Sequence, residues 1–78
     1  MTYKLTRAQF QTKVLQLKSQ SGITLASDAG DVPVPDHKGL VIHYAYVEPD
    51  LVINATCSGV FGDVVAKAAN EQLAEWLA

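Results

Sequence analysis

The sequence lacks the residues that would stabilise a small protein through disulfide bonds or a structural metal ion. It contains a single cysteine, Cys57, and two histidines, His37 and His43. One cysteine cannot close an internal disulfide, and these three side chains fall short of the four ligands of a structural zinc site. Because no Cys-x-x-Cys or His-x-x-x-His spacing is present either, we expect no metal and no other cofactor.

Long apolar runs are also missing. No stretch approaches the roughly 20 apolar residues that a membrane-spanning helix needs. The first ten residues, MTYKLTRAQF, lack the apolar core of a signal peptide. We therefore expect no membrane association and a cytoplasmic location, which suits a lone thiol.

What the chain does have is a high apolar content in a short length. It contains 78 residues, of which 49% are hydrophobic, and this composition is not that of a disordered chain. A chain of this size buries only about 60% of the surface that its unfolded form exposes. We therefore expect one domain over residues 1–78, stabilised by packing and aided by self-association.

Acidic residues are absent from the first 22 positions. This segment has a charge of +4, and the remainder has −6, from two lysines against eight acids. The favoured interpretation is that the first helix docks on its own acidic body, and the alternative is a charged partner. The four cations of the segment are Lys4, Arg7, Lys13 and Lys18.

Two helices are predicted. Thr6-x-x-Gln9 fits a capping box, and Gly22 fits the left-handed residue that follows a helix. The first apolar stripe is Phe10, Val14 and Leu17. The second helix is expected from Asp63 to about Leu77, and its inward line is Val65, Ala69, Leu73 and Trp76.

Three strands are predicted at Ile23–Leu25, Leu40–Val47 and Leu51–Cys57. Val32–Pro35 can only be a loop or a sheet edge, because proline cannot donate to a ladder. The fold class is therefore α+β with two layers, in the order helix–strand–strand–strand–helix. Both helices should cover one face of a three-stranded antiparallel sheet.

The register of the two long strands decides which side chains lie under the helices. A loop with an even number of residues pairs the bulky row ending at Tyr46 with the row beginning at Leu51, whereas a three-residue loop pairs His43 and its neighbours with that second row. We favour the even loop because it buries the larger residues.

The outward sheet face is then unusually apolar, and a protein partner or a second copy would cover it. The alternative is that valine and threonine are there for their β-propensity alone. The predicted contact residues on this face are Val41, His43, Val47, Val52 and Asn54. A second candidate surface is the first helix, with Leu15, Lys13 and Lys18.

Cys57 is the first candidate for catalysis, because it closely precedes the last helix and His43 lies on the neighbouring strand. In the favoured register, however, Cys57 points inward and His43 outward. We therefore expect a structural thiol, and a thiol enzyme is the least favoured hypothesis. Gly59-x-x-Gly62 is explained by a helix entry that needs small residues.

The element order resembles that of a double-stranded RNA-binding domain over nearly the whole chain. Pro35-Asp36-His37 before the second strand and Ala66-Lys67-Ala68-Ala69 in the last helix carry the likeness. The family's Lys-Lys-x-Ala-Lys cluster, which the resemblance implies would reach phosphates, reads Asp63-Val64-Val65-Ala66-Lys67 here. Because only Lys67 is cationic in this cluster and the pI is about 5.4, the sequence disfavours nucleic-acid binding.

We therefore expect a small non-catalytic interaction or accessory domain that binds an unidentified protein or itself. The alternative is a divergent nucleic-acid binder that uses the basic first helix.

Overall fold

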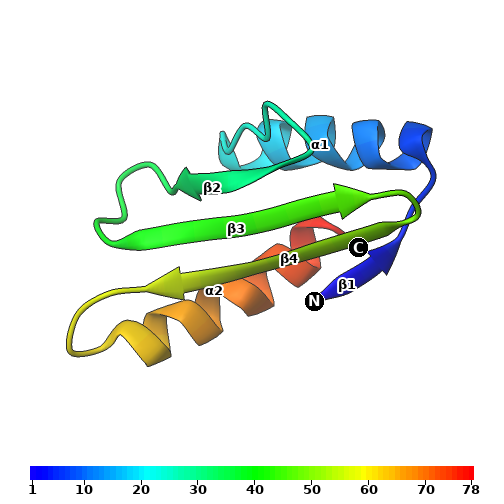
Figure 1. The fold of residues 1–78 in the computed structure, drawn as a ribbon. Coiled ribbons are helices and arrows are strands. Elements are labelled where there is room, and N and C mark those ends of the chain that lie inside the picture. The colour runs from blue at the N-terminus through cyan, green and yellow to red at the C-terminus, as the bar shows by residue number, and fades with distance from the viewer.

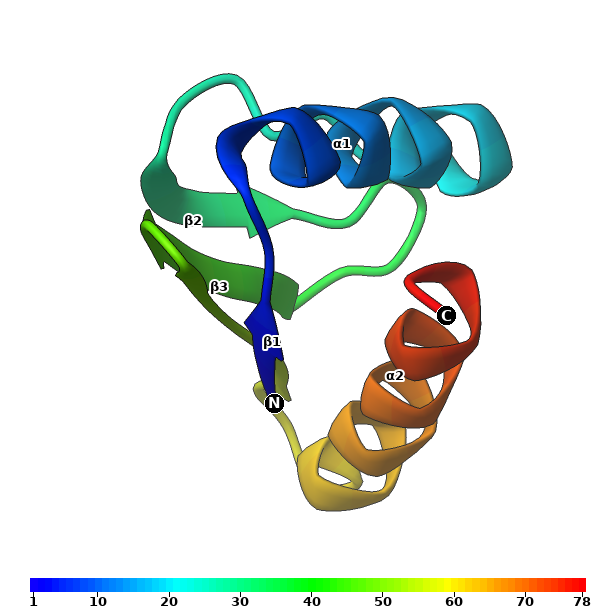
Figure 2. The ribbon, with the colours of Figure 1, turned by 90° about the vertical axis from the view of Figure 1, so that its right-hand side faces the viewer.

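A four-stranded antiparallel sheet and two helices make up the computed structural model, which describes all 78 residues (Figure 1). The spatial strand order is β1-β4-β3-β2. Figure 2 shows both helices on the same side of the sheet. The elements along the chain are β1 (Thr2–Lys4), α1 (Arg7–Ser21), β2 (Ala29–Pro33), β3 (Leu40–Val47), β4 (Asp50–Cys57) and α2 (Gly62–Trp76).

The α+β class, the antiparallel sheet and the placement of both helices on one face are confirmed. The loop between β3 and β4 has the expected even length, because Val47 pairs with Asp50 across Glu48-Pro49. This register places Tyr46 opposite Leu51, and both side chains are buried. The bulky rows of both strands therefore lie under the helices.

The prediction of a three-stranded sheet is wrong. Ile23–Leu25 is not a strand, although Ile23 and Leu25 are buried in the core. The alternation of apolar and polar residues in Ile23–Leu25 thus indicated burial correctly. This segment does not pair with β3, because β2 occupies that edge of β3. Ala29–Pro33 pairs with β3 as an edge strand. Val32 and Pro33 thus take one of the two roles, loop or sheet edge, that the sequence allowed for Val32–Pro35.

The other edge strand, β1, was not predicted, because three residues with one aromatic carry no readable alternation. It pairs with β4, so that Tyr3 lies opposite Leu51. The ammonium group of Met1 donates to the carbonyl of Ile53 at 2.9 Å. Lys4 forms an ion pair with Asp50 across the two strands.

Helix α1 begins and ends as predicted. The Gln9 N–H donates to Thr6 Oγ1 at 3.2 Å, and the Thr6 N–H donates to Gln9 Oε1 at 2.9 Å, which completes the capping box. Gly22 has φ of 77°, and its N–H donates to the carbonyl of Lys18. The predicted stripe is confirmed, since Phe10 and Leu17 are buried and Val14 is half-buried.

An aromatic stack fixes the start of α1 to the sheet. The rings of Phe10 and Tyr46 have centroids 4.2 Å apart and are nearly parallel, with an angle of 4°. The Tyr46 hydroxyl donates to the carbonyl of Leu5 at 2.7 Å. Burial, followed by the nearby charge of Glu48, raises the pKa of Tyr46.

Arg7 covers this stack and ties α1 to the segment before β2. Its guanidinium lies 4.8 Å from the centroid of the Tyr46 ring. Two of its nitrogens donate to the Asp28 carboxylate at 2.7 and 2.9 Å. These hydrogen bonds hold the pKa of Asp28 below its ordinary value and raise the pKa of Arg7. The expected docking of the basic helix on an acidic body is therefore present at this point.

Asn70 of α2 completes the hydrogen bonding of β4 where β1 ends. The Ala55 N–H donates to Asn70 Oδ1 at 2.7 Å, and Asn70 Nδ2 donates to the Ala55 carbonyl at 3.1 Å. The amide side chain thus acts as one more residue of an edge strand and joins the helix to the sheet.

Gly62 begins α2 where a side chain would not fit. A Cβ atom at this position would lie 2.2 Å from the Cys57 backbone oxygen. The small residue is therefore required by the entry of the helix, as the sequence indicated.

The lowered pKa of Asp28 predicts a pH-dependent contribution to stability. An acid with a lowered folded-state pKa stabilises the fold above its unfolded pKa of about 3.9 and loses this effect as the pH falls through the folded value. We expect Asp28→Asn to unfold at a lower urea concentration than the wild type at pH 7, and the gap to close in strong acid. A gap independent of pH would contradict this assignment.

Replacement of Asn70 by alanine should leave two backbone groups of Ala55 without their partner. We expect Asn70→Ala to lower the free energy of unfolding, measured by urea denaturation, by about 1–3 kcal/mol. The control is Lys67→Ala on the exposed side of the same helix, which should change it by less than about 0.5 kcal/mol. Equal effects of the two changes would exclude the proposed role of the amide.

Candidate functional site

The concavity with the most hydrophobic lining lies beside α2. It has a volume of about 370 Å³, and nine of its 11 lining residues are hydrophobic. One wall is α2, and the opposite wall comes from the segment after α1 and the connection between β2 and β3. Apolar side chains of both walls include Val65, Ala68, Trp76, Ile23 and Val34. We call this concavity the α2 groove.

The groove exists because α1 and α2 pack on different parts of the sheet. α1 is anchored at Tyr46, and α2 is anchored on β4 through Asn70 (Figure 2). The sequence predicted that Val65 would be an inward residue of α2, but it is 38% exposed. Its side chain lines the groove instead of meeting the core, and the small Ala68 next to it leaves the groove open.

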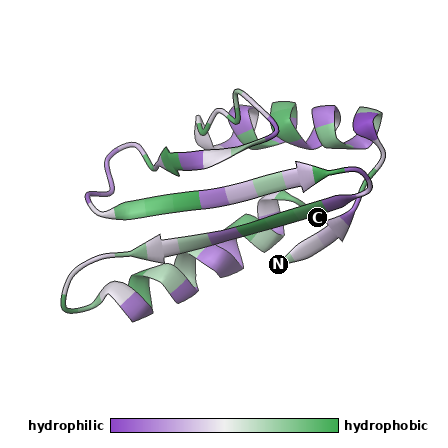
Figure 3. Ribbon diagram, in the orientation of Figure 1, coloured by the Kyte–Doolittle hydropathy of each residue, from purple (hydrophilic) through white to green (hydrophobic).

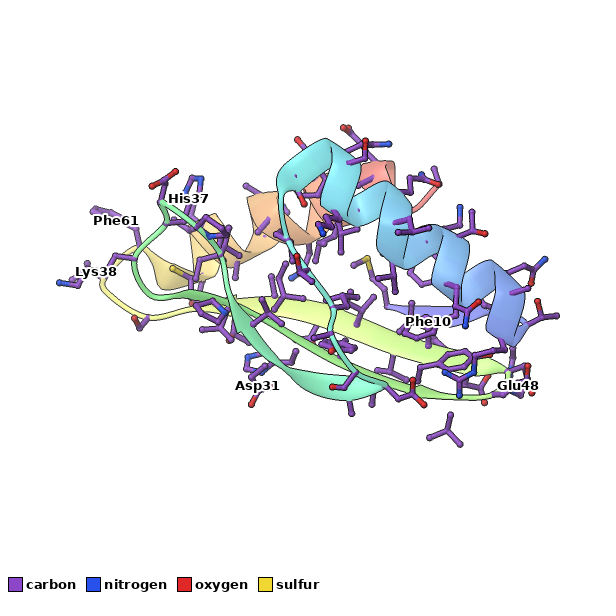
Figure 4. All side chains as sticks on the ribbon, turned by 90° about the horizontal axis from the view of Figure 1, so that it is seen from above. Phe10, Asp31, His37, Lys38, Glu48 and Phe61 are labelled. Carbon is purple, nitrogen blue, oxygen red and sulfur yellow. The ribbon has the colours of Figure 1, made fainter.

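Three exposed hydrophobic residues lie at the start of α2, the helix that forms one wall of the groove. Val60 is 95% exposed, Phe61 74% and Val64 68%. We call these residues the entry patch. Figure 4 shows Phe61 at the same end of the molecule as His37 and Lys38 of the β2–β3 connection. The two connections touch, because the Ser58 N–H donates to the carbonyl of Gly39 at 3.1 Å.

The solvent side of α2 next to the groove is acidic. Glu71 and Glu75 are exposed, and none of the three ion pairs of the structure involves them. Gln72, which lines the groove, donates to Glu75 Oε2 at 3.3 Å. The carboxylates therefore border the apolar surface without a cationic partner.

The outward sheet face has the residues that the sequence placed there. Val41 and His43 are half-buried, Val52 and Asn54 are exposed, and Val47 is 77% exposed. Figure 3 shows hydrophobic and hydrophilic residues interspersed along β3 and β4. The placement is confirmed, whereas the contact role of these residues stays a prediction.

A hydrogen-bonded row of three side chains crosses this face, and sequence reasoning missed it. His43 Nδ1 lies 2.6 Å from Asp31 Oδ1, and His43 Nε2 lies 2.6 Å from Thr56 Oγ1. Asp31 is brought here by the pairing of β2 with β3, in which it lies opposite His43.

This row has the order acid, histidine and hydroxyl that a nucleophilic catalyst uses. The side chains lie on an open sheet face, and none of them lines a concavity. The neighbouring backbone N–H groups of β3 are directed along the ladders to β2 and β4, so they provide no set of free donors for an oxyanion. The arrangement links three strands, but it lacks a substrate pocket.

Cys57 and His43 lie on opposite faces, as predicted from the register. Cys57 pairs with the buried Leu40 and packs half-buried against the core. Its Sγ lies 3.4 Å from the Ser58 carbonyl oxygen. The structure therefore brings no base to this thiol.

The candidate residues of the first helix do not converge on one site. Lys13 Nζ donates to the backbone oxygen of Ala78 at 3.1 Å. Lys18 is exposed near the end of α1, and Leu15 is exposed beside a shallow hollow that also involves Arg7. Two of the four cations of the first 22 residues, Lys4 and Arg7, are already in ion pairs.

Comparisons with protein families, curated proteins and solved structures found no match to this chain. Neither helix has the length and apolar character that crossing a bilayer requires.

The missing pocket predicts that Thr56 is not an activated nucleophile. We expect a fluorophosphonate probe, which labels serine and threonine nucleophiles, to leave the native protein unmodified by mass spectrometry. Labelling of Thr56 that disappears in His43→Ala would contradict this expectation.

Proposed function

We propose that this chain is a non-catalytic protein-interaction domain, which binds an apolar segment of a partner protein in the α2 groove. The observation that carries the proposal is that α2 forms an apolar wall of the groove and has the entry patch at its start. Nine of the 11 residues that line the groove are hydrophobic, and Val60, Phe61 and Val64 at the start of α2 are largely exposed. Contiguous apolar surface of this kind marks interaction sites in soluble proteins.

A macromolecular segment fits this surface better than a small molecule does. The volume of the groove lies within the range of about 300–1,000 Å³ of small-ligand sites. A ligand confined to the groove would nevertheless leave Phe61 and Val60 in water. A segment that runs along α2 covers both the groove and the entry patch.

The outward sheet face is a second candidate surface, for a protein partner or a second copy. Val47 and Val52 supply exposed apolar area there. The same face carries Asp31, His43 and Thr56, which hydrogen-bond one another. These polar groups are already hydrogen-bonded to one another, and none of them lines a concavity. The geometry therefore favours the α2 groove over this face.

Nucleic-acid binding through the first helix is the alternative from another class. It has little support, because Arg7 is held by Asp28 and phosphate binding needs several free cations. The proposed interaction domain is expected to act in the cytoplasm.

Trp76, the only tryptophan, lies in the groove and reports on its occupation. As a probe we would use an acetylated and amidated helical peptide of about 15 residues, the length of α2, with leucine on one face and glutamine on the other. We expect its binding to shift the tryptophan emission to shorter wavelength. Ala68→Glu should weaken binding at least about tenfold, because it places an unpaired carboxylate against apolar side chains.

The matched control is Val52→Glu, which adds the same charge at an exposed site on the outward sheet face. It should leave the affinity unchanged. Circular dichroism checks that both variants are folded. Absence of peptide binding, or loss of binding only in Val52→Glu, would overturn the assignment to the groove.

A further inference from the structure

The chemistry of the α2 groove also limits which segment can occupy it. Building on the proposed function, we infer that the occupant is an amphipathic α-helix of a partner protein whose apolar stripe is flanked by lysine or arginine. The inference rests on the shape of the α2 wall and on the charges beside it.

The α2 wall suits a helix because it is itself a straight helical ridge. α2 has 15 residues, about 22 Å at 1.5 Å per residue. Phe61, Val64, Ala68 and Gln72 follow one another at spacings of three or four residues, so their side chains form one row along α2. Such rows pack into the grooves of a second helix. The small Ala68 at the middle of the row allows the two backbones to approach closely.

The charge of α2 selects a cationic flank. Its charged residues are Asp63, Lys67, Glu71 and Glu75, a net charge of −2. Around the helix, Glu71 and Glu75 lie next to the row that contains Ala68 and Gln72, on its solvent side. Neither glutamate is in an ion pair. Lysine or arginine on the flank of a bound helix would therefore meet unpaired carboxylates.

The residues on the opposite rim of the groove carry no net charge that would offset the two glutamates. The β2–β3 connection carries one acid, Asp36, and one lysine, Lys38, beside His37. The two formal charges cancel. At the C-terminal end of α2, Lys13 of α1 donates to the backbone oxygen of Ala78, so the negative charge beside the groove is that of Glu71 and Glu75.

The same charges disfavour a second copy of this chain as the occupant. Two α2 helices packed side by side would bring together two groups of three carboxylates, with only the two Lys67 side chains to offset them. Like charges at such distances are destabilising, whereas a cationic helix removes the repulsion.

The experiment compares three helical peptides that share one leucine face and differ only in their flanking residues, which are lysine, glutamine or glutamate. Trp76 fluorescence gives each dissociation constant. We expect the lysine peptide to bind about threefold to tenfold more tightly than the glutamine peptide, as two exposed ion pairs allow. The glutamate peptide should bind most weakly, and added salt should reduce the differences.

A double variant tests whether Glu71 and Glu75 cause the preference. Glu71→Gln/Glu75→Gln should bind the lysine and glutamine peptides equally, with the affinity for the glutamine peptide unchanged. The control is Thr2→Lys/Gln11→Lys, which changes the net charge equally at exposed sites away from the groove and should retain the preference.

The outcomes separate the two proposals. Equal binding of all three peptides, lost in Ala68→Glu, would overturn the cationic helix and leave the interaction domain intact. Concentration-dependent dimerisation by light scattering, abolished by Phe61→Ser, would also overturn it, in favour of a second copy. If no peptide binds, both proposals fall.

Discussion

The register between β3 and β4 is the constraint on which the other contacts depend. It places Tyr46 opposite Leu51 under the helices, and Phe10 can stack on the Tyr46 ring only from that side. Arg7 then covers the stack and reaches Asp28. A slip of one residue would turn the tyrosines outward and His43 inward, because side chains alternate along a strand. The two-residue loop therefore fixes both the core and the polarity of the outer face.

The open surface of the molecule follows from how the two helices are anchored. The Phe10 stack holds α1, and the Asn70 side chain holds α2 on β4 beyond the end of β1. The two anchors lie on different strands, so the helices diverge over part of the sheet (Figure 2). Val65 and Trp76 line the space that neither helix closes. The contacts that hold each helix on the sheet therefore also keep the helices apart and leave the groove between them.

Much of the fold could be predicted from local signals, whereas the candidate site could not. Thr6 and Gln9 predicted the start of α1, and Gly22 predicted its end, because helix capping depends on a few neighbouring residues. The inward and outward rows of side chains on β3 and β4 could be assigned from the two-residue period of a strand and from the size of the side chains. By contrast, Val65 fits an inward helical stripe whether it meets a core or a groove. The meeting of Asp31, His43 and Thr56 depends on three strands, so no local pattern contains it.

The sequence by itself determined the two helices, the two long strands and the face on which the side chains of these strands lie, because period and capping act over a few residues. Only the tertiary structure decided that Ile23–Leu25 packs without pairing, that Thr2–Lys4 becomes an edge strand and that α2 stands apart from α1. These features arise from competition between distant segments for the same strand edge and the same core volume. The free energy of that competition depends on contacts that are far apart along the chain.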